Sequence, residues 1–273
     1  MLGNGMAALR DTLVRARTEP VLSILIFHRV LAAPDPMAAG GVTQDEFARI
    51  AAIVRRHFAC FPLSEAVARL DSGVPGHMLA ITFDDGYCDN LDVALPILRR
   101  YGLPATVFVA TNYLDGGVMW NDVVGESIAR TSHSTLSHEL LDTAAVPLDG
   151  VAARQRARKK MIGALKYLAQ DERERLAGEL ARKLEVRPRT DLMLSTAQLQ
   201  TLAADPLIEI GGHTRSHPIL ACTDDAAAAN EMAEGKKQLE EIIGKPVYGF
   251  AYPNGQPGKD YMPEHAGMAP VSY

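Results

Sequence analysis

The sequence predicts an α/β protein with a mainly parallel sheet, on three observations. Short apolar runs rich in β-branched residues alternate with segments whose apolar residues recur at helical spacing. The polar residues that could carry chemistry follow the carboxyl ends of these runs, where parallel sheets place their sites. The 273 residues, 47% hydrophobic and 22% charged, suit a single globular domain spanning residues 1–273.

Strands and helices are expected in alternation along the chain. Expected strands cover residues 21–27, 58–63, 78–83, 105–109, 207–210 and 247–251. Expected helices cover residues 44–56, 64–70, 91–101 and 224–243. Thr43 and Glu46 form a capping-box pattern before the first helix, and Ser64 is expected to cap the second. Pro96 predicts a kink in the third helix, which Gly102 should close.

The strand pattern disappears between about residues 120 and 195, which predicts a helical insertion. Apolar residues at helical spacing over 157–168 and 176–184 indicate two amphipathic helices there. Residues 151–190 contain 12 Lys and Arg against 5 Asp and Glu. A solvated helical pair is the simpler explanation of this charge, and contact with an anionic polymer or with membrane headgroups is the alternative.

Composition excludes several classes of protein. A net charge of −5 gives no electrostatic signal for nucleic acid. Three scattered cysteines, Cys60, Cys88 and Cys222, provide neither a disulfide framework nor a cysteine-based zinc site. No apolar run is long enough to span a bilayer, and the first residues lack the apolar core of a signal peptide. A cytoplasmic location is therefore expected, with a periplasmic or membrane-associated one as the alternative.

Two short motifs could form a metal site. Asp84 and Asp85 leave the expected strand 78–83 at a glycine turn, where one carboxylate could bind a metal and the other could face substrate. His213 and His217 follow the strand 207–210 and are four residues apart, one helical turn, so that both rings could reach one ion. Each motif alone has a simpler explanation, a capped turn or a surface coincidence. Their shared position at strand ends favours the metal site.

Two further segments could lie at the same carboxyl edge of the sheet as these motifs. Residues 250–255 (FAYPNG) form a polar turn after the last expected strand, and by themselves they are an ordinary turn signal. His28 follows the first strand, where a structural histidine is the simpler interpretation.

Together these motifs resemble the polysaccharide deacetylases, the NodB-homology or carbohydrate esterase family 4 domain, over about residues 21–255. Residues 82–86 (TFDDG) are similar to the family's first motif, which implies that Asp84 is the catalytic base and Asp85 a metal ligand. Residues 213–217 (HTRSH) are similar to its second motif, which implies that His213 and His217 complete the ligand set. The implied fold is a (β/α) barrel, and the implied substrate is an N-acetylated glycan.

The chain departs from the family pattern in two places. Ala251 stands where many members have an arginine that braces the base, whereas Asn254 keeps the backbone N–H expected to stabilise an oxyanion. The family's fourth and fifth motifs, the latter with its histidine acid, have no visible counterpart. The barrel is therefore expected to be incomplete at the C-terminus, with one side open unless a homo-oligomer mate, another partner or a rearrangement covers it. His28 or the metal alone would have to replace the acid.

The resemblance thus implies a metal-dependent N-deacetylase. Zn²⁺ is the expected metal, and Co²⁺ or Ni²⁺ also suit two histidines and one aspartate. The metal would activate water and the acetyl group, Asp84 would take the proton of water, and the Asn254 N–H would help to stabilise the oxyanion. Two alternatives remain: a catalytically impaired glycan-binding or assembly protein of the same fold, and a metal-dependent hydrolase of phosphate esters.

Overall fold

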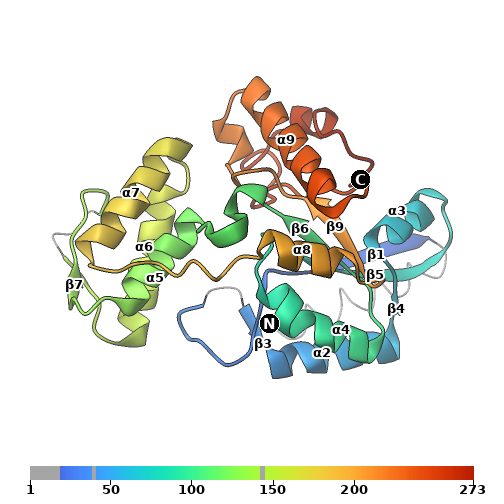
Figure 1. The fold of residues 1–273 in the computed structure, drawn as a ribbon, viewed down its shortest axis with the longest axis horizontal. Coiled ribbons are helices and arrows are strands. Elements are labelled where there is room, and N and C mark those ends of the chain that lie inside the picture. The colour runs from blue at the N-terminus through green and yellow to red at the C-terminus, as the bar shows by residue number, and fades with distance from the viewer. Residues whose placement is uncertain (1–18, 39–40, 142–144) are drawn as a thin grey trace.

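A computed structural model describes residues 19–38, 41–141 and 145–273. Within these residues a five-stranded sheet has the order β1-β5-β6-β9, with β4 beside β5, and all its pairings are parallel (Figure 1). Its strands are β1 (Pro20–Phe27), β4 (Ala59–Cys60), β5 (Gly76–Phe83), β6 (Ala105–Val109) and β9 (Ile208–Gly212). The predicted α/β class with a parallel sheet is confirmed. In the described residues no pairing joins β1 to β9, so the sheet is open on that side.

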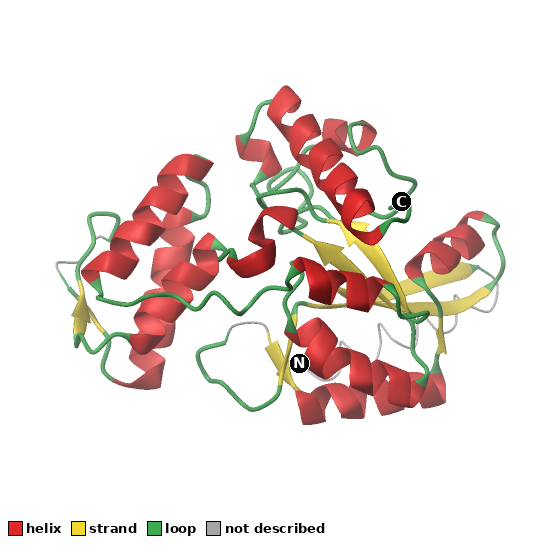
Figure 2. Ribbon diagram, viewed as in Figure 1, coloured by secondary structure: helices red, strands yellow, loops and turns green. Residues whose placement is uncertain are grey.

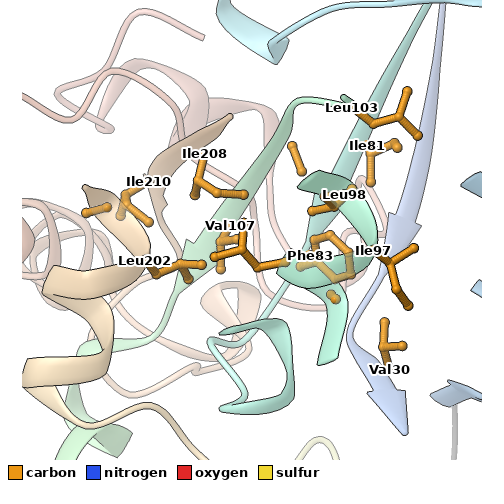
Figure 3. Packing of buried hydrophobic residues seen from close by; sticks show 14 of the residues in the cluster. Val30, Ile81, Phe83, Ile97, Leu98, Leu103, Val107, Leu202, Ile208 and Ile210 are labelled. Carbon is orange, nitrogen blue, oxygen red and sulfur yellow. The ribbon is translucent and has the colours of Figure 1, made fainter. Parts of the chain in front are cut away.

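Helices pack on the sheet and enclose the main apolar core (Figure 2). They are α2 (Gln44–His57), α3 (Leu63–Asp71), α4 (Leu95–Tyr101), α8 (Thr196–Ala203) and α9 (Asp225–Ile243). Figure 3 shows Phe83 and Val107 of the sheet close to Leu98 of α4 and Leu202 of α8. Burial of such side chains is the dominant stabilising contribution to a fold of this kind.

The helix signals are confirmed in part. Thr43 forms the predicted capping box with Glu46, and Gly102 ends α4 with φ 60°. One π-helical turn (Asn90–Ala94) precedes α4, and Pro96 lies in the first turn of α4, where its missing N–H is tolerated. The helix predicted over 91–101 is therefore divided into this π-helical turn and α4, with Pro96 next to the junction. Short 3₁₀ turns cover Thr111–Gly116, Leu220–Cys222 and Pro263–Gly267.

The insertion forms a second group of helices beside the sheet (Figure 1). It contains three helices where two were predicted: α5 (Trp120–Arg130), α6 (Gly150–Leu165) and α7 (Gln170–Lys183). Two short strands that were not predicted, β7 (Thr135–Leu136) and β8 (Val146–Pro147), pair in antiparallel fashion. The insertion has an apolar cluster of its own, which includes Val124, Ile128, Met161, Leu165 and Leu180.

Three further predictions differ from the structure. Residues 247–251 do not form a strand, and only Phe250 makes a single bridge to Gly212. Strand β4 is two residues long, and Pro62, not Ser64, precedes α3. Two short strands, β2 (Arg29–Leu31) and β3 (Gly41–Thr43), form a separate parallel pair that was not predicted. Among the described helices, none has both the length and the hydropathy needed to cross a membrane.

Candidate metal centre

The structure brings Asp85, His213 and His217 together at the carboxyl end of the sheet. Asp85 follows β5, and the two histidines follow β9. Oδ1 of Asp85 lies 3.4 Å from Nε2 of His213 and 3.3 Å from Nε2 of His217. One ligand atom from each residue can be chosen so that all lie within 4.8 Å of one another. The predicted convergence of the two motifs is therefore present.

This arrangement suits a divalent metal. Oδ1 of Asp85 is buried and has no hydrogen-bond partner among the described residues, which is costly unless a cation is bound. Nδ1 of His213 donates a hydrogen bond to the Ala251 carbonyl at 2.8 Å, which leaves its Nε2 lone pair free for a metal. Two imidazoles and one carboxylate form a set that leaves coordination positions open for water and substrate.

The two histidines do not lie on a helix, contrary to the predicted helical turn. The segment from His213 to His217 is a loop in which Thr214 has φ 64° and His217 has φ 51°. The Thr214 hydroxyl accepts a hydrogen bond from the His217 backbone N–H at 3.0 Å. This loop therefore turns both rings toward Asp85 through left-handed backbone conformations, which a threonine rarely adopts.

Helix α9 holds this loop in place. The Glu231 carboxylate accepts hydrogen bonds from the N–H groups of Arg215 (2.9 Å) and Ser216 (2.8 Å) and from the Ser216 hydroxyl (2.8 Å). One turn later, a Cβ at Gly235 would lie only 2.9 Å from the carbonyl carbon of Thr214. The loop is thus supported by a carboxylate and by close contact with the helix backbone, and nothing in the two histidine motifs pointed to either residue.

The charges at the centre favour metal ligation. Burial opposes ionisation of Asp85, but the close contact with the His213 ring and the charges of His217 and His213 hold its pKa below the usual range. Burial lowers the pKa of His217 to about 4, so its imidazole is neutral at pH 7. Burial raises the pKa of Asp84, the charge of Asp85 adds to this, and His213 and His28 oppose it. Asp84 is therefore a more basic carboxylate than Asp85.

The other predicted site residues, His28, Ala251 and Asn254, are not part of the ligand cluster. The carbonyl of His28 accepts a hydrogen bond from Nδ2 of Asn90 at 2.9 Å, and His28 lines the same cavity as Asp85. Ala251 is in contact with the centre through its carbonyl. Asn254 lies three residues further along, exposed and with φ 64°, and its role as an oxyanion donor stays a prediction.

A cavity of about 740 Å³ lies between Asp85 and the insertion. Asp85, His28 and Tyr87 line it on the sheet side. Helices α5 and α6 line the opposite side, and residues 35–38 line it as well. Its volume is within the range of pockets that enclose a drug-sized ligand. No motif in the sequence places the insertion beside Asp85.

The chain is similar to known proteins in sequence and in fold. A family model described as "Polysaccharide deacetylase" matches residues 71–268. The Bacillus subtilis (strain 168) protein YxkH is 40% identical over 55 residues, which span 20% of this chain and only 15% of YxkH.

Solved structures share the fold. The deacetylase PplD of Streptococcus pyogenes, in complex with acetate, aligns with a TM-score of 0.58 and 17% identity over 91% of this chain and 79% of its own. IcaB of Ammonifex degensii aligns with a TM-score of 0.54 and 19% identity over 91% and 79% of the two chains. A de-N-acetylase of Aggregatibacter actinomycetemcomitans aligns with a TM-score of 0.54 and 12% identity over 91% and 85%.

Proposed function

Because this chain belongs to the polysaccharide deacetylase family, we propose that it is a metal-dependent hydrolase that removes N-acetyl groups from an amino-sugar polysaccharide or oligosaccharide. The observation that carries the proposal is the buried cluster of Asp85, His213 and His217, with the unpartnered Oδ1 of Asp85 among its ligand atoms. Asp84, the adjacent residue, supplies the separate carboxylate that a hydrolytic centre needs as a base.

In this proposal Asp84 takes the proton of the attacking water. Its pKa is raised by burial, so the carboxylate is a stronger base than that of an exposed aspartate. A divalent metal bound to Asp85, His213 and His217, with Zn²⁺ as the expected ion, would supply Lewis acidity toward the acetyl group and water.

Two other groups are proposed to act on the oxyanion formed by the attack of water and on the amine that leaves afterwards. The backbone N–H of Asn254 is proposed to donate a hydrogen bond to the oxyanion, a role that does not depend on the side chain. His28 lines the cavity next to Asp85, and its backbone is fixed by Asn90. We propose that His28 donates the proton to the departing amine, which leaves a free amino sugar and acetate.

The test combines metal content with acetate release. Purified wild-type protein should contain about one equivalent of metal by elemental analysis. His213→Ala should lose it, because Asp85 and His217 alone cannot complete the site, whereas His57→Ala, an exposed histidine on α2, should retain it. The metal-loaded wild type should release acetate from at least one N-acetylated glycan in a panel of chitin-like oligomers, peptidoglycan fragments and exopolysaccharides.

The outcomes separate the alternatives. A chain that binds no metal would contradict the proposal at its first step. Bound metal and glycan affinity without acetate release would favour the catalytically impaired glycan-binding protein. Release of phosphate from phosphate esters, with no release of acetate, would favour the phosphate-ester hydrolase.

A further inference from the structure

Helix α6 carries positive charge without any negative charge of its own. Its residues include no aspartate or glutamate, and they include Arg154, Arg156, Arg158, Lys159 and Lys160. With 12 Lys and Arg against 5 Asp and Glu, residues 151–190 have a net charge of +7 in a chain whose net charge is −5, so the remainder carries −12. The excess of positive charge is therefore concentrated on the insertion.

Two of the five cations of α6 are engaged within the protein. Nη1 of Arg154 donates a hydrogen bond to the Ala129 carbonyl at 3.2 Å, and its Nη2 donates one to the Thr131 carbonyl at 3.0 Å. Nη1 of Arg158 donates a hydrogen bond to the Met37 carbonyl at 2.8 Å. These two arginines satisfy carbonyl groups of other segments, so they have a structural role.

The other three cations face solvent. Arg156, Lys159 and Lys160 are exposed, and their side chains have no ion pair or hydrogen bond with any residue that the structure describes. Arg156 precedes the two lysines by three and four residues, so the three charges are neighbours on the helix surface. These three side chains are called the basic face of α6 below.

The stability of α6 itself does not explain the basic face. Like charges three or four residues apart destabilise a helix, and the macrodipole favours acidic residues in the first turn and basic residues in the last. Helix α6 has neither. Helix α7, the next along the chain, has both, and its Arg175 pairs with Glu179 at 2.7 Å. The charges of α7 therefore support their own helix, whereas those of α6 are available for a partner.

The basic face borders the cavity beside the metal centre. Lys159 lines the cavity that lies between Asp85 and the insertion, whereas Arg156 and Lys160 do not line it. The face thus extends from the edge of the cavity onto the outer surface of α6. A polymer that reaches the centre from this side would contact the face with a part of its chain that lies outside the cavity.

The composition of α6 favours a polyanion over a membrane surface as the partner. An interfacial helix presents large apolar residues beside its cations. In α6 the large apolar residues Met161 and Leu165 are buried, and Val151, at the opposite end of the helix, is exposed. Anionic groups repeated along a polysaccharide need only charged partners, which the three exposed cations provide.

We propose that the basic face of α6 binds an anionic polysaccharide, one that carries carboxylate or phosphate groups along its chain. The proposal rests on the deacetylase function proposed above in taking the polymer to be a glycan. Because the attraction acts between exposed charges, salt should weaken it: the screening length falls from about 10 Å at 0.1 M to about 3 Å at 1 M ionic strength.

A pair of double variants provides the test. Arg156→Gln/Lys160→Gln removes two charges from the basic face, and Arg175→Gln/Arg182→Gln removes two exposed charges from α7. Glutamine keeps a high helix propensity in both. The probe is a set of hyaluronan oligosaccharides, which carry a carboxylate in every disaccharide, and their carboxyl-reduced forms are the neutral control. Calorimetry with the metal-loaded full chain measures binding.

The wild type should bind hyaluronan at about 0.1 M salt, lose most of this binding at about 1 M salt, and bind the carboxyl-reduced form far more weakly. The α6 double variant should bind hyaluronan about tenfold more weakly than the wild type, and the α7 double variant within about twofold of it. A difference between two variants of equal net charge would assign the binding to the basic face.

Three results would overturn the proposal: equal binding by the two double variants, equal binding of hyaluronan and its carboxyl-reduced form, or tighter binding to duplex DNA or to vesicles of anionic lipid than to hyaluronan. Acetate release decides the enzymatic function separately. A chain that binds hyaluronan through α6 but releases no acetate from any glycan would support the basic face as a binding site and contradict only the proposed function.

Discussion

The sheet region and the insertion both reach the same cavity, but they hold their polar groups in different ways. At the sheet, backbone groups fix the metal-binding side chains: the Ala251 carbonyl orients His213, and the backbone of residues 214–217 directs His217. In the insertion, Asp122 and Lys159 project from helices that have their own apolar cluster. The reaction centre therefore depends on the backbone path, whereas the cavity wall can change by side-chain substitution alone.

The largest expected effect tests whether the chemistry resides in the sheet region. Asp84→Asn should lower kcat for acetate release about 10²- to 10⁴-fold, because an amide cannot act as a general base. Metal content and melting temperature should stay close to wild type, since Asp84 is not part of the ligand cluster. Asp92→Asn, an exposed position on the π-helical turn, is the control. Undiminished kcat in Asp84→Asn would contradict the base assignment.

The next effect tests whether the two apolar clusters are separate. Leu98→Ala in the sheet region and Met161→Ala in the insertion should each lower the free energy of unfolding by about 2–5 kcal/mol. Hydrogen exchange should show where the loss falls. In Met161→Ala the amides of α5, α6 and α7 should exchange faster while those of β5 and β6 stay protected. Equal loss of protection in both regions would mean that they unfold as one unit.

A smaller effect tests the contact between the regions at Asp122. Burial, with help from the charge of Asp85, raises the pKa of Asp122 to about 6, whereas the hydrogen bond from Tyr87 opposes the shift. The folded protein therefore binds this proton more tightly than the unfolded chain. Its contribution to stability is present below about pH 4 and falls, by about 3 kcal/mol in total, as the pH rises to about 6 and above.

Asp122→Asn should remove this part of the pH dependence. In metal-free protein, urea unfolding should show a variant that gains on the wild type as the pH rises from 4 to 7. A constant difference between the two proteins over this range would show that Asp122 does not titrate with a raised pKa.

The smallest expected effect is on zinc affinity, through the hydrogen bonds by which Glu231 of α9 holds residues 213–217 in place. Glu231→Gln loses the charge that accepts three hydrogen bonds from Arg215 and Ser216. Zinc affinity should fall about 10- to 100-fold, as is typical when groups that orient metal ligands are changed. Competition with a chromogenic chelator measures this. Glu241→Gln, exposed near the end of the same helix, should bind zinc as the wild type does.

The sequence could predict the strands whose residues are buried on both faces. Short continuous apolar runs such as those of β5 and β6 are typical of such strands. It could not predict that residues 247–251, which are also mostly apolar, do not form a strand. There the backbone of Phe250 bonds to the carbonyl of Tyr273, and pairing with β9 is limited to one bridge at Gly212. Strand formation at this point depends on which chain segments lie alongside, which local pattern does not encode.

In the site, too, some features could be predicted from the sequence and others depend on the tertiary structure. The types and spacing of Asp85, His213 and His217 were visible in the chain, so their convergence could be predicted. The left-handed loop that directs the histidines could not, since threonine gives no signal for that conformation. The sequence did not single out Asp122 either, because an acidic residue in the first turn of a helix is common. Only the tertiary contact with Tyr87 distinguishes it.

The contact between α9 and residues 213–217 gives a sequence pattern that can be searched for in other chains. Glu231 and Gly235 are one helical turn apart, and each is an unusual requirement: a carboxylate for the loop amides, and the lack of a side chain at a mid-helix position. Glycine there costs about 1 kcal/mol of helix stability relative to alanine, so drift alone would tend to remove it. A Glu-x-x-x-Gly pair about fourteen residues after a His-x-x-x-His motif would identify relatives that build the loop in this way, even where overall identity is too low to align.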